Sequence, residues 1–267
     1  MQRRFLAASR VAIVLAFVGS LAAQASSPEG SRTWVGHEAA FEQALRTGTI
    51  TKMENVPIGV TKPQRATLDP AAPVARFAWK PIKPGYKGGH MESYKAEIAA
   101  YELDKLLGLH MVPPVVERTI DGKTGAAICW IERTTAWDKD HPPQGPEPGW
   151  GAQLTRLKMF DLLIGNIDRN QGNLLYDDDW HLFLIDHSRG FTRKKDLRGI
   201  APLVRVDRAL WTKMQALTLP DAQAALGRWV SPNDLKAMLA RRDKMAEAIA
   251  KLVAEHGEAG VFFGVVP

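Results

Sequence analysis

The sequence predicts a two-lobed α+β fold, and three observations on the order of its segments support this prediction. Strand signals, in which branched and aromatic residues lie between Gly/Pro-rich turns, are concentrated between residues 52 and 135. Helical spacing of apolar residues dominates from about residue 151 onward. The stretch DKDHPPQGPEPGWG, at 138–151, is typical of a linker. We therefore expect an N-terminal lobe at about 52–135, a linker at about 136–150 and a C-terminal lobe at about 151–267.

The composition is that of a globular chain with an N-terminal targeting segment. The 267 residues are 45% hydrophobic and 24% charged, which suffices for one large core or two smaller lobes. A basic start is followed by an apolar run from Val11 to Ala23 and by Ala-Gln-Ala, so residues 1–25 read as a signal peptide and 26–267 as the exported domain. The run is shorter than the roughly 20 residues that a spanning helix needs, so we expect no stable membrane span after cleavage.

Much of the positive charge belongs to this leader. The net charge is +6, and the leader holds three arginines and no acid; without it, 32 basic residues face 29 acidic ones, a net charge of +3. No continuous basic stripe with interleaved aromatic residues is present, which argues against a nucleic-acid partner. The single cysteine, Cys129, lies in the apolar run AAICWI and is expected to be a buried small hydrophobic residue.

In the N-terminal half, the elements alternate between strands and helices. A helix is expected within 26–50, and Gly/Pro residues break the segment 52–68, whose ends resemble strands. VARFAWKPI at 74–82 has strand composition, and PIKPGYKGGH at 81–90 reads as a loop. The turn DGKTG joins two strand candidates, VPPVVERTI and AAICWIE. A helix at about 91–107 is expected to end at Gly108 and to bury an apolar stripe made of Tyr94, Ile98, Tyr101 and Leu106.

In the C-terminal half, a helix at 154–164 precedes a β-hairpin, and the segment from about 206 to 256 is mostly helical by pattern. The hairpin is expected to enter at 174–176, turn at 177–180 and return at 181–185. Antiparallel pairing would then place Asn173 across from Asp186. Asp177, Asp178 and Asp179 are expected to be a solvated turn.

Asp168, Asn173 and Asp186 form a candidate metal and catalytic cluster at the base of this hairpin. Hard cations such as Mg²⁺ prefer such oxygen ligands, with open positions left for phosphate. The spacing Asp168-x-x-x-x-Asn173, followed by Asp186 after a hairpin, matches the pattern of catalytic and metal-binding residues in protein kinases. Turn preference alone would be a simpler explanation of Asp and Asn at a helix-to-hairpin junction. A calcium loop would also begin in this way, but Gln171 and Asp177 stand where it needs Gly and Glu.

A kinase also needs a strand lysine that holds phosphates and a helix glutamate that holds this lysine. Lys80 ends the strand candidate 74–82, and Glu97 borders the apolar stripe of the following helix, where a carboxylate is costly unless it is paired. We favour Lys80 and Glu97 as this pair over Lys83 and Glu102, because they fit the order of strand and helix.

The stretches LIGNIDRNQGNLL…LFLIDHSRGF and EIAAYELDKLLGLHMVPPVV resemble the atypical protein-kinase-like superfamily. It includes phosphatidylinositol 3- and 4-kinases, HipA-type kinases and secretory-pathway kinases. The resemblance implies a bilobal protein-kinase-like fold with a small β-rich N-lobe and a mostly helical C-lobe that carries the catalytic hairpin. It also implies site residues: Asp168 as catalytic base or orienting group, Asn173 and Asp186 as ligands of Mg²⁺ or Mn²⁺, Lys80 and Glu97 as the pair that anchors the phosphates of ATP, and a hinge at CWIE, with Ile131, that faces adenine through its backbone.

These observations favour an exported, ATP- and metal-dependent phosphotransferase whose hydroxyl acceptor is a protein, a glycan or a lipid. Two departures keep an alternative open. Many relatives carry histidine at the position of Asn170, and asparagine cannot act as an acid or base. No G-x-G-x-x-G loop is present; the nearest phosphate-loop candidate holds Gly59 and Thr61. The alternative is a catalytically inactive kinase-like binding module, and a third reading is an exported structural or metal-binding domain.

Overall fold

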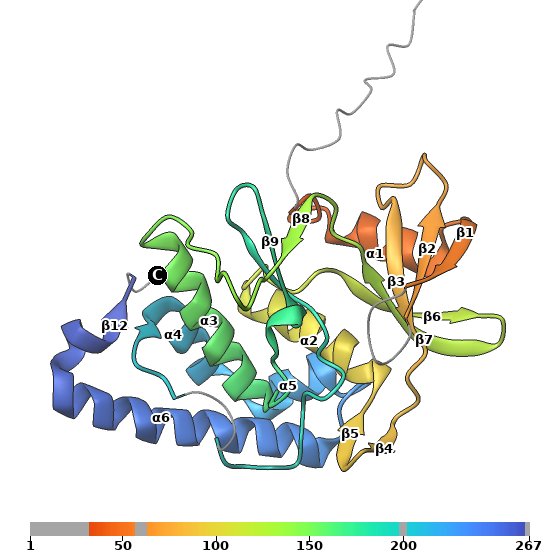
Figure 1. Ribbon diagram of the computed structural model, residues 1–267. Coiled ribbons are helices and arrows are strands. Elements are labelled where there is room, and N and C mark those ends of the chain that lie inside the picture. Colours follow the sequence, from red (N-terminus) through yellow and green to blue (C-terminus); the bar gives the residue numbers. More distant parts are fainter. Residues whose placement is uncertain (1–31, 57–62, 198–201, 265–267) are drawn as a thin grey trace, which may run out of the picture.

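The computed structural model describes residues 32–56, 63–197 and 202–264. A β-rich lobe lies beside a helical lobe, as Figure 1 shows, so the predicted bilobal α+β architecture is confirmed. The predicted signal peptide, 1–25, and Thr61 lie outside the described residues. Within the described ranges, none of the helices combines the length and the apolar character that a membrane crossing requires.

The N-lobe is built on an antiparallel five-stranded sheet with the order β1-β2-β3-β7-β6. The strands are β1 (Ile50–Asn55), β2 (Gln64–Leu68), β3 (Arg76–Lys80), β6 (Val115–Ile120) and β7 (Lys123–Cys129). The helix α1 (Glu38–Thr47) contacts β6 and β7. Both ends of the segment predicted to be strand-like at 52–68 are strands. The strand predicted at AAICWIE, residues 126–132, ends earlier than expected, since β7 stops at Cys129.

The two faces of this sheet pack against different helices, and the alternation of side chains in β3 decides which residue faces which helix. Phe77 and Trp79 are buried in the cluster that includes α1. Ala78 packs against the other cluster, which includes α2 (Tyr94–Leu107). Because side chains alternate along a strand, Lys80 lies on the same face as Ala78 and is directed toward α2.

The helix α2 starts later than the pattern predicts. Residues 91 and 92 belong to the hairpin of β4 (Gly85–Lys87) and β5 (His90–Glu92), and the side chain of Ser93 then caps α2 by accepting a hydrogen bond from Lys95 N. Gly108 ends the helix as predicted, with a left-handed φ of 61° that favours glycine. Leu106, expected in the apolar stripe, is 43% exposed, and Leu107 is buried in its place.

The C-lobe is mostly helical. Its elements are α3 (Gly149–Ile164), α4 (Arg208–Ala216), α5 (Leu219–Leu226) and α6 (Pro232–Val261), with a short parallel pair formed by β11 (Val206–Asp207) and β12 (Phe262–Phe263). α3 begins five residues before the predicted start at Leu154. The added turn brings in Trp150, which is buried against the rings of Trp137, Tyr176 and Trp180. This packing explains why a Gly/Pro-rich segment becomes helical at its end.

The predicted hairpin is present, but its register differs by one residue from the expectation. β9 (Leu174–Asp177) pairs with β10 (Leu182–Leu184) and with β8 (Thr134–Ala136). Leu174 pairs with Leu184, and the next bond runs from Ile185 N to Asn173 O at 3.1 Å. Asn173 therefore lies across from Ile185, and the prediction that it faces Asp186 is wrong. Asp186 leaves the strand geometry with a φ of 61°.

The hairpin tip is only partly the solvated turn that the acidic run suggests. Asp178 and Asp179 are exposed, as predicted. Asp177 is buried instead, and its carboxylate accepts hydrogen bonds from the backbone N of His181 at 2.7 Å and lies 2.9 Å from that residue's Nδ1. The prediction is thus wrong for Asp177, because its side chain closes the turn from inside.

Candidate active site

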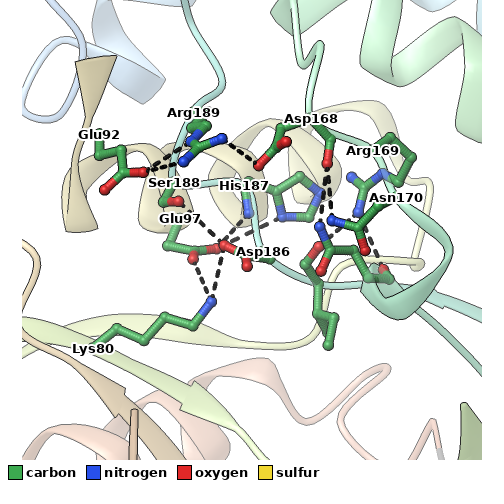
Figure 2. A network of polar contacts seen from close by, with 12 residues as sticks. Lys80, Glu92, Glu97, Asp168, Arg169, Asn170, Asp186, His187, Ser188 and Arg189 are labelled. Atoms are coloured by element: carbon green, nitrogen blue, oxygen red, sulfur yellow. Dashed lines mark hydrogen bonds and ion pairs between the residues drawn. The ribbon is translucent and has the colours of Figure 1, made fainter. Parts of the chain in front are cut away.

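Lys80, Glu97 and Asp186 meet in the interior between the sheet, α2 and the segment after β10. Lys80 Nζ lies 2.9 Å from Glu97 Oε1 and 3.1 Å from Asp186 Oδ1, as Figure 2 shows. Lys80 and Glu97 are both buried. Their competitors take other places, since Glu102 pairs with Lys105 at 3.0 Å and Lys83 is exposed. The expected ion pair thus forms and extends to a second carboxylate.

Lys80 and Asp186 stabilise each other's charge, whereas burial raises the pKa of Glu97 above its usual value and the charge of Asp186 adds to this rise. Burial by itself would lower the pKa of Lys80, but the carboxylates of Glu97 and Asp186 raise the pKa above its usual value. Burial would raise the pKa of Asp186, but Lys80 outweighs it and holds the pKa below its usual value. Lys80 is therefore a cation, and Asp186 a carboxylate, near neutral pH. Such a pair can hold a phosphate and a divalent cation side by side.

The loop between α3 and β9 holds Asp168 and Asn173 close together. Asn173 Nδ2 donates to the backbone O of Asp168 at 3.3 Å, which leaves the amide oxygen of Asn173 as the group that can accept. The backbone N of Asn173 bonds Asn170 O at 3.0 Å. Asn170 itself is exposed, and its Nδ2 lies 3.4 Å from Asp168 O. Together with the bond between Asn173 and Ile185, these contacts bring the three predicted residues to one end of the hairpin.

Arg169 fastens this loop to the rest of the C-lobe. Its guanidinium bonds both oxygens of Asp161, at 2.9 and 3.0 Å, and it also donates to Asn173 O and to Ile185 O, at 3.2 and 2.6 Å. Asp161 is buried in α3, and its Oδ1 also accepts from Asn166 Nδ2 at 3.1 Å. Arg169 thus links α3, the loop and the residues that flank both strands of the hairpin, and its pair with Asp161 is bidentate.

A second arginine, Arg189, connects Asp168 with the N-lobe. Its Nη1 lies 3.0 Å from Asp168 Oδ2, and its Nε and Nη2 donate to Glu92 Oε1 at 2.8 and 2.6 Å (Figure 2). Hydrogen bonding to Glu92 is the main reason that the pKa of Arg189 is raised. Glu92 also lines a cavity of about 570 Å³, together with Trp79 and Lys123. This cavity therefore lies next to the candidate site, on the Glu92 side of Arg189, and Asp186 is not one of its lining residues.

His187 follows Asp186 and is completely enclosed. Its backbone N donates to Glu97 Oε2 at 2.8 Å, and its ring meets Phe160 edge to face. Burial lowers the pKa of His187 well below its usual value, and the nearby charges of Arg169 and Lys80 act in the same direction. The imidazole is therefore neutral, and its ring packs against Phe160 next to the ion pair of Lys80 and Glu97.

Ile131, the predicted hinge residue, lies at the passage between the lobes. Ile131 lies between β7 of the N-lobe sheet and β8, which pairs with the hairpin. Its side chain is buried beside Cys129 and Phe183, and its carbonyl oxygen accepts from Thr134 Oγ1 at 3.4 Å. The position between the lobes is that expected for a hinge, although the chain there is not a strand. Thr61 lies outside the described residues, so its predicted role stays a prediction.

Sequence reasoning missed Asp161, Arg169, Glu92 and Arg189. A usable signal was present for Asp161, because a carboxylate within the apolar run MFDLLI needs a partner when the helix is buried. Arg169 lies within the quoted motif and is a natural partner for it. Glu92 and Arg189 gave no such signal, since both lie in polar stretches of ordinary loop composition.

A different group of potential metal ligands lies at the opposite end of the hairpin. Ligand atoms of Asp177, Asp179 and His181 all lie within 4.8 Å of one another. Asp177 is already hydrogen-bonded to His181 there, and Asp179 is exposed. Because this group lacks the contacts with Lys80, it is separate from the site built around Asp186.

Comparison with known proteins shows little similarity in sequence. No protein-family model matches the chain. Protein Rv2133c of Mycobacterium tuberculosis is 24% identical over 135 residues, which cover 39% of this chain and 49% of that protein. The chain thus spans about half the length of the curated relative that it matches.

Solved structures show a closer likeness in fold. A structure of hydra Fam20 with sugar matches with a TM-score of 0.65 and 18% identity, covering 88% of this chain and 93% of that one. A Golgi casein kinase with Mn/ADP bound matches with a TM-score of 0.61 and 13% identity, covering 85% and 79%. A second structure of the Golgi casein kinase gives 0.63 and 14%, with the same coverage. At these identities the likeness shows the fold alone, and the chain therefore shares the bilobal fold of these solved structures.

Proposed function

We propose that the protein is an ATP- and divalent-metal-dependent phosphotransferase that transfers the γ-phosphate to a hydroxyl group. The observation that carries this proposal is the ion-paired trio of Lys80, Glu97 and Asp186, adjoined by the loop that holds Asp168 and Asn173. The similarity in fold to a Golgi casein kinase with bound Mn/ADP supports it. The leader-like residues 1–25 support an exported location, and the acceptor is a protein, a glycan or a lipid.

The donor set suits Mg²⁺ or Mn²⁺. The carboxylate of Asp186 and the free amide oxygen of Asn173 are hard ligands, and few protein ligands leave room for phosphate oxygens. When bound, the cation neutralises charge on the phosphates. Lys80 is placed to bind the phosphates while Glu97 holds its ammonium group in position. The backbone at Ile131, between the lobes, is proposed to face the adenine, and Thr61 to contact phosphate.

Asp168 would act on the acceptor. The acceptor hydroxyl donates a hydrogen bond to the carboxylate, its oxygen forms the new bond to the γ-phosphorus, and the bond between this phosphorus and the leaving oxygen of ADP breaks. The hydroxyl proton passes to Asp168. Since most of the catalysis in such reactions comes from positioning and charge neutralisation, Asp168 contributes chiefly by orienting the nucleophile.

Binding and chemistry can be separated by measuring both on the purified protein. We expect ATP with Mg²⁺ or Mn²⁺ to raise the melting temperature and labelled phosphate to appear in an acceptor within a panel of proteins, glycans and lipid vesicles. Asp168→Asn should keep the nucleotide-dependent stabilisation but lower transfer by about 10²- to 10⁴-fold, the usual contribution of a general base. A folded wild-type protein that shows no nucleotide-dependent stabilisation would contradict the proposal.

A second candidate is a catalytically inactive kinase-like module. Asn170 favours it, because this exposed amide stands where many members of the superfamily have histidine. The same experiment distinguishes the two functions. Metal-dependent nucleotide stabilisation without transfer to any acceptor, and equal in the wild type and Asp168→Asn, would favour the inactive module.

A further inference from the structure

We infer that Arg189 is a positioning residue for Asp168 and that Glu92 holds Arg189 in place; this inference rests on the proposed phosphotransfer. The starting observation is the isolation of the Asp168 carboxylate. Its side chain is 44% exposed, and among the residues that the structure describes its one ion pair is the contact with Arg189 Nη1 at 3.0 Å. An exposed Asp side chain exchanges among its staggered χ1 rotamers and has a broad range of χ2 unless a partner restrains it.

The contact uses one carboxylate oxygen and leaves the other. Arg189 approaches Oδ2 of Asp168, so Oδ1 is the atom that can accept from an acceptor hydroxyl. A guanidinium is planar and always charged, and it offers donors in fixed directions. Arg189 therefore determines the direction of the free oxygen more sharply than a flexible lysine would.

Glu92 fixes the other edge of the guanidinium. Both Nε and Nη2 of Arg189 donate to Glu92 Oε1, and the Glu92 side chain is only 6% exposed. Glu92 ends β5, where it pairs with Gly85, so its backbone is held in a hairpin. The bridge thus runs from a fixed carboxylate of the N-lobe, through Arg189, to the exposed carboxylate of the C-lobe loop.

The bridge is part of a longer seam between the start of α2 and the segment after β10. Ser93 N donates to Ser188 O at 2.9 Å, directly beside the contact between Glu92 and Arg189. The backbone N of His187 donates to Glu97, the partner of Lys80. A displacement of α2 would therefore move Arg189 together with Glu97. Since Glu97 holds Lys80, the proposed phosphate-binding residue, the position of Asp168 is coupled to that of Lys80.

Arg189→Ala tests the inference through the turnover rate and through chemical rescue. We expect kcat for metal-dependent ATP turnover to fall about 100-fold, as small misplacements of catalytic groups do, while KM for ATP and the nucleotide-dependent rise in Tm stay unchanged. Free guanidinium, far below denaturing concentrations, should restore part of kcat, and ammonium or sodium should restore less, because only guanidinium bridges two carboxylates with paired donors. Glu92→Gln should lower kcat less, and guanidinium should not rescue it.

Arg193→Ala is the matched control, since Arg193 is exposed in the same segment and its ion pair with Asp234 lies outside the site. We expect its kcat to equal that of the wild type. Loss of nucleotide binding in parallel with kcat, without guanidinium rescue, would reduce Arg189 to a structural role and overturn the inference.

A crystal structure of the Arg189→Ala variant keeps the inference testable if no turnover is found. The Asp168 side chain should then adopt a different rotamer or lose order, and an unchanged Asp168 would overturn the inference. A wild-type protein without nucleotide-dependent stabilisation contradicts the proposed function instead, so the two failures are distinguishable.

Discussion

The two ends of the β9–β10 hairpin are both rich in acidic residues, but the side chains at the tip and at the base have different kinds of partners. At the tip, Asp177 bonds His181, four positions along the chain. At the base, Asp186 pairs with Lys80 of the N-lobe sheet, and Arg189 just beyond bonds Glu92, 97 positions away. The hydrogen bonds between Asp177 and His181 are local, although the charge of Asp177 also acts on Arg32, whereas the acids of the candidate site are joined to other elements and to the other lobe.

This difference has an energetic side. The tip carboxylate satisfies a backbone N–H that the turn itself creates, as turn-forming Asp residues commonly do. The base contains buried charges, which are costly to desolvate and which persist because each is paired. Breaking a contact at the base should therefore cost more stability than breaking one at the tip, and only the base should affect nucleotide binding.

The largest expected effect comes from replacing Asp161, the residue of α3 that pairs with Arg169 in the loop before the hairpin. Asp161→Ala leaves the guanidinium of Arg169, whose side chain is 9% exposed, without its carboxylate. Removing one partner of a buried pair costs about 3–5 kcal/mol, so we expect a loss of this size in the free energy of unfolding, measured by urea denaturation. Glu247→Gln, at an exposed pair with Lys244, should change it by less than about 1 kcal/mol.

A double variant sharpens this prediction. In Asp161→Ala with Arg169→Met, no unpaired charge remains, so part of the lost stability should return. Equal destabilisation by the single and the double variant would show that the cost arises from lost packing and not from the unpaired arginine.

The next prediction separates the two groups of possible metal ligands. Asp186→Asn should abolish the Mn²⁺-dependent stabilisation by nucleotide, which amounts to about 2.7 kcal/mol when the ligand is at 100 times its Kd. Lys80 retains Glu97 in this variant, so the fold should persist. Asp179→Asn, which makes the same chemical change at the tip, should leave the stabilisation intact. The reverse result, in thermal shift with and without Mn²⁺, would place the nucleotide-linked metal at the tip.

Residue patterns predicted the fold well where local chemistry decides the structure. Strand composition and the D-G turn predicted β6 and β7, and helical spacing with Gly108 predicted the end of α2. Boundaries were displaced where a long-range contact intervened. α3 gains its first turn because Trp150 packs on the hairpin, and α2 loses residues to the β4–β5 hairpin.

The candidate site could be predicted only in part. Lys80 and Glu97 were found because a carboxylate beside an apolar helix stripe needs a partner and because the two residues fit the order of strand and helix in a kinase, and the spacing of Asp168, Asn173 and Asp186 is a motif. The bridge through Arg189 joins residues from two polar loops, and no spacing rule relates them. The hairpin register was missed because the turn closes between Asp177 and His181 with Trp180 at a left-handed φ of 62°, which pattern alone does not reveal.

The smallest expected effect tests the tip directly. Asp177→Ala removes both acceptors that face His181, so a partly buried backbone N–H loses its partner, and we expect a loss of about 1–3 kcal/mol in the free energy of unfolding. Asp178→Asn, one position along and exposed, should stay within about 0.5 kcal/mol of the wild type. Because neither side chain reaches Lys80 or Asp186, both variants should bind nucleotide as the wild type does, as measured by the increment in Tm on adding ATP with Mn²⁺. A reduced increment in Asp177→Ala, at unchanged stability, would mean that the two ends of the hairpin are coupled and that the contrast between them fails.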